Sequence, residues 1–325
     1  MGENAPVLGG GTIPFPHQNA EGATWGIAAT LLGGSLRALR NRDRTMTLRR
    51  LVELIHAKEP RASMSASKLS RIEVGDRRLH KADDIRPILD ALKIEGSQRE
   101  ELMKLARDAS VEGLSDVYRD VAPDWMGRLI ELESRAKDLF SLETRAVPGL
   151  LQTEAYTRAV LPGSLPVRLR GNAERLAALR VARRERYLQA GPPRSVFYIK
   201  HTVLEDLVGS PRVMADQIRR LLEYTELPDI GVRVIPPGGD RLRWVSSMTR
   251  LVFHPGDGLP EIIYNEEHGR GKYYGPPEDA PATEGEPSEF NELMEVLQDA
   301  MVLAPGREES RQVLHRLLRG WEREA

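Results

Sequence analysis

The sequence of 325 residues contains no cysteine, which excludes disulfides, thiolate zinc sites, cysteine nucleophiles and thiol redox switches. No apolar run approaches the roughly 20 residues that a membrane-spanning helix needs. The first residues show no basic segment followed by an apolar one, so we expect no signal peptide. These absences predict a cytoplasmic protein that does not enter a membrane.

Patterns typical of catalysis and metal binding are also lacking. The seven histidines are scattered, and no pair has the His-x-x-x-His spacing of a helical zinc site. Asp257, Glu266 and His268 form either a metal or acid–base cluster or an ordinary loop surface, and the loop surface is favoured. Ser246 and Ser247 do not lie in a nucleophile elbow, and no glycine-rich dinucleotide fingerprint is present. We therefore expect no catalytic residue, no metal and no cofactor, and not an enzyme.

The net charge is only −1, but the charged residues are unevenly distributed along the chain. Between Arg37 and Lys81 the chain has 13 Lys and Arg against 5 Asp and Glu, whereas residues 271–300 have 8 Asp and Glu against 1 Lys. A basic segment attracts phosphate even in a protein that is neutral as a whole. This front segment is therefore either a nucleic-acid surface or an arginine-rich solvated surface.

Length and a hydrophobic share of 40% indicate a globular protein of about two domains. Residues 1–23, rich in Gly and Pro, are expected to be a flexible leader. Residues 24–110 are expected to form one domain and residues 111–325 another. Apolar periodicity in the first domain predicts short helices at about 30–43, 48–55, 65–73, 82–94 and 97–109.

The third of these helices, residues 65–73, combines an apolar face with an unusual polar face. Leu69 and Ile72 are three residues apart and share one side of the helix. Ser65 can cap its first turn, where free N–H groups suit phosphate. Ser67 and Arg71 point elsewhere. Alone, such a stretch is more often an amphipathic surface helix, but the basic, all-helical surroundings favour a helix-turn-helix plan.

The order of motifs strengthens this interpretation. It runs Leu-Arg-x-Leu-Arg from residue 36, Thr-Leu-x-x-Leu from 47, Ser-x-Ser-Lys-Leu-Ser-Arg-Ile-Glu from 65 and Gly-Asp-Arg-Arg from 75. This order resembles the Xre/Cro-repressor-like family of helix-turn-helix transcriptional regulators. The resemblance implies double-stranded DNA as a partner, a homodimer, and a place at the nucleoid.

The same resemblance assigns roles within the motif. The base-reading positions are Ser65, Ala66, Ser67 and Arg71. Thr47 meets a phosphate in this family, and neighbouring polar and basic residues are expected to do the same: Lys68, Ser70, Arg77, Arg78 and Lys81. Structural support is expected from Leu69 and Ile72 and from an ion pair between Arg40 and Glu73.

One departure from the family pattern lies between the second and third helices. The family's turn has about 3–4 residues, whereas residues 56–64 form a longer insertion that contains Pro60. Proline cannot lie inside a regular helix, so a loop is expected. This loop either follows the second helix directly or follows a second helix that is longer than in the family. The insertion is either a second DNA contact, through Lys58 and Arg61, or a neutral bulge.

The second domain is predicted to be α+β, with helices packed on a small mixed sheet, so that the chain is mainly α overall. Strands are expected at 196–199, 232–235, 248–253, 261–264 and 272–274. Helices are expected at 125–140, from Thr153, and at 172–190, 211–225, 290–301 and 307–321. Helix 172–190 is either a nucleic-acid helix or a core helix with a solvated arginine face, and the core helix is favoured.

A second set of motifs runs through this domain. It comprises Glu133 with Ala136, the Val-Pro-Gly-Leu-Leu-Gln-Thr loop from residue 147, Leu-Arg-x-x-Arg from 179 and Tyr264-x-Glu266. These resemble the C-terminal domain of WhiJ-like, antitoxin-type regulators of actinobacteria. The resemblance implies DNA binding, often with a small acidic partner protein.

We therefore expect a sequence-specific transcriptional regulator that reads the major groove with helix 65–74. The C-terminal domain would serve dimerisation, partner binding or ligand sensing. One alternative is an antitoxin-like protein whose main task is binding a small partner. Another is a regulator that responds to a small molecule, with a pocket lined by aromatics that are more often core: Tyr198, Trp244, Phe253 and Tyr264.

Overall fold

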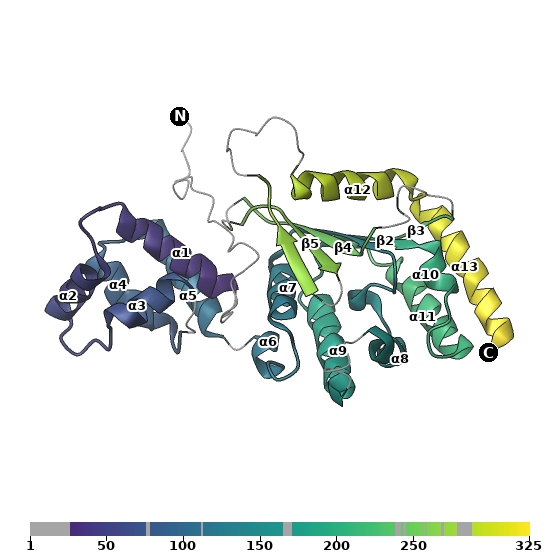
Figure 1. The fold of residues 1–325 in the computed structure, drawn as a ribbon, viewed down its shortest axis with the longest axis horizontal. Helices are drawn as coiled ribbons and strands as arrows, with labels where there is room; N and C mark the ends of the chain where they lie inside the picture. Colours follow the sequence, from purple (N-terminus) through teal and green to yellow (C-terminus); the bar gives the residue numbers. More distant parts are fainter. Residues whose placement is uncertain are drawn as a thin grey trace. The chain divides into compact units, whose positions relative to one another are not determined.

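The computed structural model describes residues 27–75, 79–111, 113–164, 171–237, 242, 245–255, 257, 259–267, 270–277 and 288–325. The expected leader therefore lies outside the described residues. The chain divides into two compact units, with the boundary between Val117 and Tyr118, and each unit is described by itself (Figure 1).

The described part of the first unit contains helices and no strand. Its elements are α1 (Ile27–Asn41), α2 (Leu48–Lys58), α3 (Ala66–Glu73), the 3-10 turn η1 (Ala82–Ile85), α4 (Arg86–Ala91), α5 (Gly96–Ser110) and α6 (Leu114–Val117). The expected single helix over 82–94 is thus a 3-10 turn followed by a short α-helix. Apolar side chains at helical spacing fill one core, as in Leu32 and Leu36 of α1, Leu51 and Ile55 of α2, and Leu69 of α3.

Two glycines let α1 and the end of α3 approach closely. A Cβ on Gly33 would lie 2.2 Å from the carbonyl oxygen of Ile72, closer than any real contact. Gly75 has φ of +71°, and its Cβ would lie 2.7 Å from Thr30 Cα. Glycine is therefore required at both positions, because a side chain would push the two helices apart.

The second unit is built on a six-stranded mixed sheet of order β3-β2-β1-β4-β5-β6. The strands are β1 (Asp138–Glu143), β2 (Arg194–Lys200), β3 (Ile230–Ile235), β4 (Met248–Val252), β5 (Ile262–Glu267) and β6 (Arg270–Tyr274). Strands β1, β2 and β3 run parallel, and β4, β5 and β6 continue antiparallel from β1. All five strands expected from the sequence lie in this sheet, and β1 is an additional strand.

Helices cover both faces of this sheet. They are α7 (Asp124–Arg135), η2 (Gly149–Leu151), α8 (Glu154–Ser164), α9 (Ala173–Gln189), α10 (His201–Glu205), α11 (Pro211–Tyr224), α12 (Glu289–Leu303) and α13 (Arg307–Glu324). In Figure 1, α12 lies across one face, and α7, α8, α9 and α11 lie against the other. Between α12 and the sheet, Leu297 of α12 packs in a core with Leu142, Tyr198, Met248 and Ile263.

The expected fold class, helices in the first unit and an α+β second unit, is confirmed. The prediction of a helix over 125–140 is wrong, because α7 ends at Arg135 and β1 begins at Asp138. Of the aromatic residues near strands, Tyr198 belongs to the core, Phe253 and Tyr264 are also buried, and Trp244 lies outside the described residues. In the described part of the chain, no helix is long and apolar enough to cross a membrane.

Candidate nucleic-acid interface

Helix α3 is held in the first unit by one face. Ser65 caps the helix, since its Oγ accepts a hydrogen bond from Lys68 N at 3.1 Å and so satisfies one of the free amides of the first turn. Leu69, Ile72 and Glu73 are buried, and the two apolar side chains join the core. The bounds of α3 agree with the expected helix.

The opposite face of α3 is open to solvent. Ser65, Ser67 and Arg71 are exposed, and Ala66 and Ser70 are half-buried. All four residues expected to read bases therefore lie at the N-terminus or on the outer face of α3. This arrangement leaves a guanidinium and two hydroxyls available to a partner.

Lys68, expected to contact phosphate, is partly engaged within the protein. Its Nζ donates a hydrogen bond of 2.8 Å to the carbonyl of Ser63, in the loop that precedes α3. The ammonium group retains further donors. Lys68 therefore stabilises the approach to α3 while leaving a positive charge beside it.

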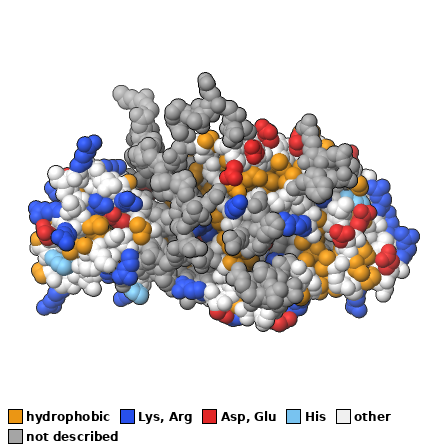
Figure 2. Space-filling view, in the orientation of Figure 1, with side chains coloured by type: hydrophobic (Ala, Val, Ile, Leu, Met, Phe, Trp, Pro, Cys, Tyr) orange, Lys and Arg blue, Asp and Glu red, His pale blue; other side chains and the backbone are white. Residues whose placement is uncertain are grey.

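The other expected phosphate contacts are distributed around α3. Thr47 is exposed and caps α2, with Oγ1 accepting from Arg50 N at 3.1 Å. Lys81 is exposed, whereas Arg77 and Arg78 lie outside the described residues. Figure 2 shows Lys and Arg side chains over much of the first unit on the face in view, with few acidic ones.

An ion pair braces α3 against α1. Arg40 Nε donates to Glu73 Oε1 at 2.7 Å and Nη2 donates to Oε2 at 2.8 Å, while Nη1 reaches the carbonyl of Met46 at 3.0 Å. The side chains of Arg40 and Glu73 are only 13% and 4% exposed. The hydrogen bonds to Glu73 raise the pKa of Arg40 above its usual value, against a smaller lowering by burial. This is the pair that the resemblance implied.

The insertion between α2 and α3 is packed against the unit. Helix α2 extends to Lys58, whose Nζ donates to the carbonyl of Asp90 at 2.8 Å. Met64 at the other end of the insertion is buried in the core. Arg61 is exposed. Of the two cations considered for a second DNA contact, Lys58 thus holds α4, and Arg61 faces solvent.

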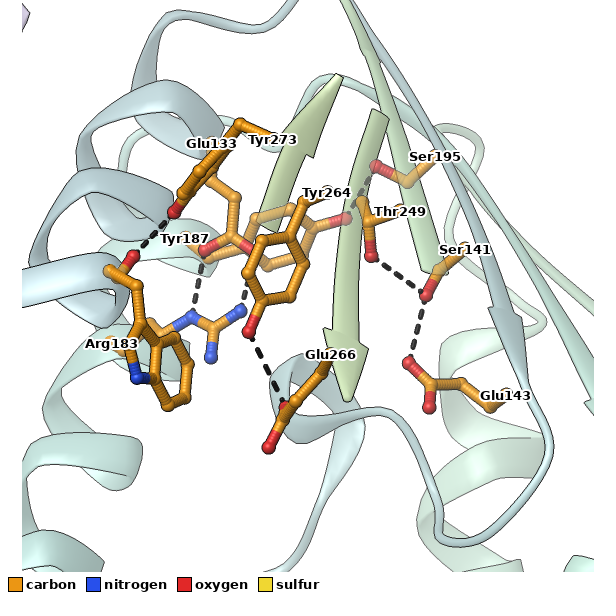
Figure 3. A network of polar contacts seen from close by, with 11 residues as sticks. Glu133, Ser141, Glu143, Arg183, Tyr187, Ser195, Thr249, Tyr264, Glu266 and Tyr273 are labelled. Carbon is orange, nitrogen blue, oxygen red and sulfur yellow. Dashed lines mark hydrogen bonds and ion pairs between the residues drawn. The ribbon is translucent and has the colours of Figure 1, made fainter. Parts of the chain in front are cut away.

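In the second unit, the motif residues come together from distant parts of the chain. Arg183 of α9 donates to both carboxylate oxygens of Glu133 in α7, with 2.7 Å from Nε to Oε2. The two side chains are only 13% and 6% exposed. Burial alone lowers the pKa of the Arg183 guanidinium, but the charge and hydrogen bonds of Glu133 raise it. Figure 3 shows this pair near Tyr264 of β5.

The loop at residues 147–153 is pinned by buried amides. Gln152 Nε2 donates to the carbonyl of Val147 at 2.7 Å, and its Oε1 accepts from the hydroxyl of Thr157 at 3.0 Å. Gln217 of α11 accepts from Thr153 N at 2.7 Å. Thr153 also caps α8, as expected from the sequence. These bonds make the loop a rigid part of the unit, because buried polar groups are satisfied in one geometry.

Two carboxyl groups of the sheet, those of Glu143 and Glu266, lie on the side of the sheet that faces Arg183 (Figure 3). Ser141 Oγ donates to Glu143 at 2.9 Å, and Tyr264 donates a long hydrogen bond of 3.4 Å to Glu266. Burial raises the pKa of Glu143 to about 7, against a lowering by the hydrogen bond from Ser141. Sequence reasoning missed Glu143, because it belongs to none of the motifs.

The arginines of α9 correct one interpretation of the sequence. A solvated arginine face was favoured for this helix, and Arg175 and Arg186 are indeed exposed. Arg180, Arg183 and Arg184 are half-buried instead. The face is therefore divided, with its middle turned into the unit and its ends turned to solvent.

The residues considered for a metal or acid–base cluster are not brought together. Asp257 accepts a hydrogen bond from His254 N at 3.2 Å in its own loop, and Glu266 lies beside Tyr264. His268 lies outside the described residues. Within the described ranges, no three His, Asp or Glu side chains are placed to hold a metal ion.

Comparison with protein families assigns both units. A helix-turn-helix domain matches residues 31–102, which contain α2 and α3, and such a domain points to a DNA-binding regulator rather than an enzyme. A domain of unknown function, DUF5753, matches residues 126–316. No curated protein and no solved structure matches the chain. Since the second match covers more than half of the sequence, the chain belongs to the DUF5753 family, with a helix-turn-helix domain before the family's defining domain.

Proposed function

We propose that this protein is a sequence-specific transcriptional regulator that reads the DNA major groove with α3. The observation that carries the proposal is the division of α3 into two faces. Leu69, Ile72 and Glu73 hold it against the unit, while Ser67 and Arg71 are left exposed. A recognition helix needs this division, because its orientation must be set by the protein while its outer side chains meet base edges.

The side chains of α3 differ in what they can recognise. Arg71 can form a bidentate contact with the O6 and N7 of guanine, the commonest specific pairing. Ala66 can contact a thymine methyl, and Ser67 can bond with several bases. Thr47 and Lys81 would meet phosphates, supplying affinity and salt dependence but little specificity.

We expect the protein to act as a homodimer in the cytoplasm, at the nucleoid. A single helix-turn-helix reads few base pairs, and dimers place two recognition helices one helical turn of DNA apart, about 34–36 Å. The second unit would supply the dimer contacts. Genome-wide mapping of the tagged protein tests the proposal, with enrichment expected at two-fold symmetric sites. A profile without enriched sites would remove the basis for the proposed function.

Arg71→Ala should weaken binding to the mapped operator by about 1–3 kcal/mol and relax base preference at one position of each half-site. The guanidinium would otherwise donate two hydrogen bonds to a single base. Titration of operator variants by fluorescence anisotropy measures both effects. Arg107→Ala is the matched control, since Arg107 is an exposed arginine of the first unit that lies on α5, outside the residues considered for DNA contact. If Arg71→Ala lowered the affinity for all DNA sequences equally, Arg71 would contact a phosphate and not a base.

Binding of a small acidic protein is an alternative function that one surface favours. Arg316, Arg319 and Arg323 are exposed on α13 at spacings that place them along one side of the helix. Combined replacement of all three by glutamate should abolish capture of a small acidic protein encoded nearby and leave operator binding unchanged. Pull-down of the co-expressed pair measures the first effect, and a pair that survived the replacement would contradict this role of α13.

A further inference from the structure

The second unit contains a cavity of about 660 Å³ on the face of the sheet that carries α7, α8 and α9. It lies where β1 ends at Glu143 and where Leu207–Gly209 follow α10, which itself follows β2. Both strands are parallel, so the cavity opens at their carboxyl ends. Ligands of open α/β sheets bind at this edge, and the volume is typical of sites for small molecules.

One side of the cavity presents a guanidinium with few partners. Arg180 makes a single long hydrogen bond among the described residues, 3.5 Å from Nη1 to Gln152 Oε1. Burial lowers its pKa, with Glu266 and Glu143 acting in the opposite direction from a distance. A guanidinium has five N–H donors, and taking a cation partly out of water is costly when most of its donors have no partner. Arg180 is therefore arranged to accept an anion.

The neighbouring Arg183 provides a contrast within the same helix. It is one turn further along α9 and is neutralised by two hydrogen bonds from its side chain to Glu133. A third arginine of the lining, Arg145, is exposed and donates a long hydrogen bond of 3.4 Å to the carbonyl of Glu266. Of the three, Arg180 is half-buried and has no carboxylate partner among the described residues. This difference assigns the anion to Arg180.

The other residues that line the cavity include apolar and aromatic side chains as well as hydrogen-bonding groups. The rings of Trp125 and Tyr264 stack with centroids 6.0 Å apart and an interplanar angle of 24°. Val147, Val160 and Leu207 line the cavity as well. The carboxyl groups of Glu143 and Glu266 also face it. The lining is thus amphipathic, with a cation, an aromatic wall and acceptors for a donor group.

We propose that this cavity binds a small aromatic carboxylate that carries a hydroxyl or amino group. Its carboxylate pairs with Arg180, its ring lies against Trp125 and Tyr264, and its donor group meets the carboxyl groups of Glu143 and Glu266. Planar guanidinium and carboxylate groups match in a bidentate geometry. The cavity lies in the second unit and ligand binding there does not require DNA, so its test is independent of the proposed function.

Isothermal titration calorimetry of the full-length protein with two probes tests the proposal. The probes are 4-hydroxyphenylacetate and its uncharged amide, 4-hydroxyphenylacetamide, which has nearly the same shape. The acid should bind with one site per chain, and about 10- to 100-fold more tightly than the amide, because only the acid forms the charge-assisted pair. Failure of the acid to bind at millimolar concentration, or equal affinity for the two probes, would overturn the proposal.

The variant Arg180→Gln locates the binding. This substitution should lower the affinity for the acid by about 10- to 100-fold and leave the affinity for the amide unchanged. Arg180→Lys should lower the affinity for the acid by an intermediate factor. Arg186→Gln is the matched control, since Arg186 lies on the same helix and is exposed. Circular dichroism establishes that each variant is folded. An acid that bound Arg180→Gln as tightly as the unaltered protein would bind elsewhere, and the assignment would be wrong.

Discussion

Glu73→Ala should lower the free energy of unfolding of the first unit by about 3–5 kcal/mol. The substitution removes the partner of Arg40, which is only 13% exposed, and leaves a cation without its ion pair beside the core. It also frees the end of α3, because the carboxylate of Glu73 joins this helix to α1. The operator affinity of the variant should fall in parallel, since the bound orientation of α3 depends on the same contact.

Hydrogen exchange measured by mass spectrometry separates this effect from changes elsewhere. Peptides from residues 27–110 should lose protection, and peptides from the second unit should not. Glu53→Ala is the control, since Glu53 pairs with Arg50 on the surface with 64% and 58% of the side chains exposed. Surface pairs contribute about 0–1 kcal/mol. A similar loss of protection in Glu73→Ala and Glu53→Ala would show that the buried ion pair does not stabilise the first unit more than a surface pair does.

A double substitution, Arg40→Met with Glu73→Leu, refines the result. Replacing both partners of a buried ion pair by apolar residues is often neutral or stabilising. The double variant should therefore recover most of the stability lost in Glu73→Ala. Recovery of stability without recovery of operator affinity would show that the pair sets the orientation of α3 as well as its stability.

Glu133→Ala should lower the free energy of unfolding of the second unit by about 3–5 kcal/mol. Arg183 would remain buried against α7 without the carboxylate that accepts two of its hydrogen bonds. Chemical denaturation followed by tryptophan fluorescence reports the change, because Trp125 lies on α7 and lines the neighbouring cavity.

A surface pair in the same unit provides the control for this prediction. Glu154 pairs with Arg158 at 2.9 Å, and 57% and 47% of the two side chains are exposed. Glu154→Ala should change the stability by no more than about 1 kcal/mol. If Glu133→Ala reduced the hydrogen-exchange protection of the first unit, the pair would not act within the second unit alone, and this prediction would be wrong.

Local patterns were sufficient for most elements, and β1 shows where they fail. Leu139, Phe140 and Leu142 continue the apolar spacing of α7, and Ala136 is not a helix-ending residue. Nothing nearby marks the change from helix to strand. The strand is instead determined by its pairing with β2 and β4, which are distant in sequence. Tertiary context overrides local propensity in such cases.

The outer face of α3 could be predicted from the sequence, whereas the cavity of the second unit could not. The residues of α3 are consecutive, so caps, periodicity and motif order placed them on the correct faces. The cavity combines Trp125, Glu143, Arg180 and Tyr264, which belong to four elements. The sequence showed that some of these residues belong to motifs, but it could not show that Arg180 faces inward while Arg175 on the same helix faces solvent.

The central position of β1 also has a consequence for how the chain is synthesised. One edge of β1 pairs with β2, and the other pairs with β4, in the register Asp138↔Arg194 and Asp138↔Val252. Residues 144–247 lie between β1 and β4. At roughly 5–20 residues per second, these roughly 100 residues take about 5–20 s to translate. During that time one edge of β1 awaits its native neighbour. A nascent chain stalled before β4 should therefore bind chaperones, whereas the helical unit ahead of it can already be folded on the ribosome.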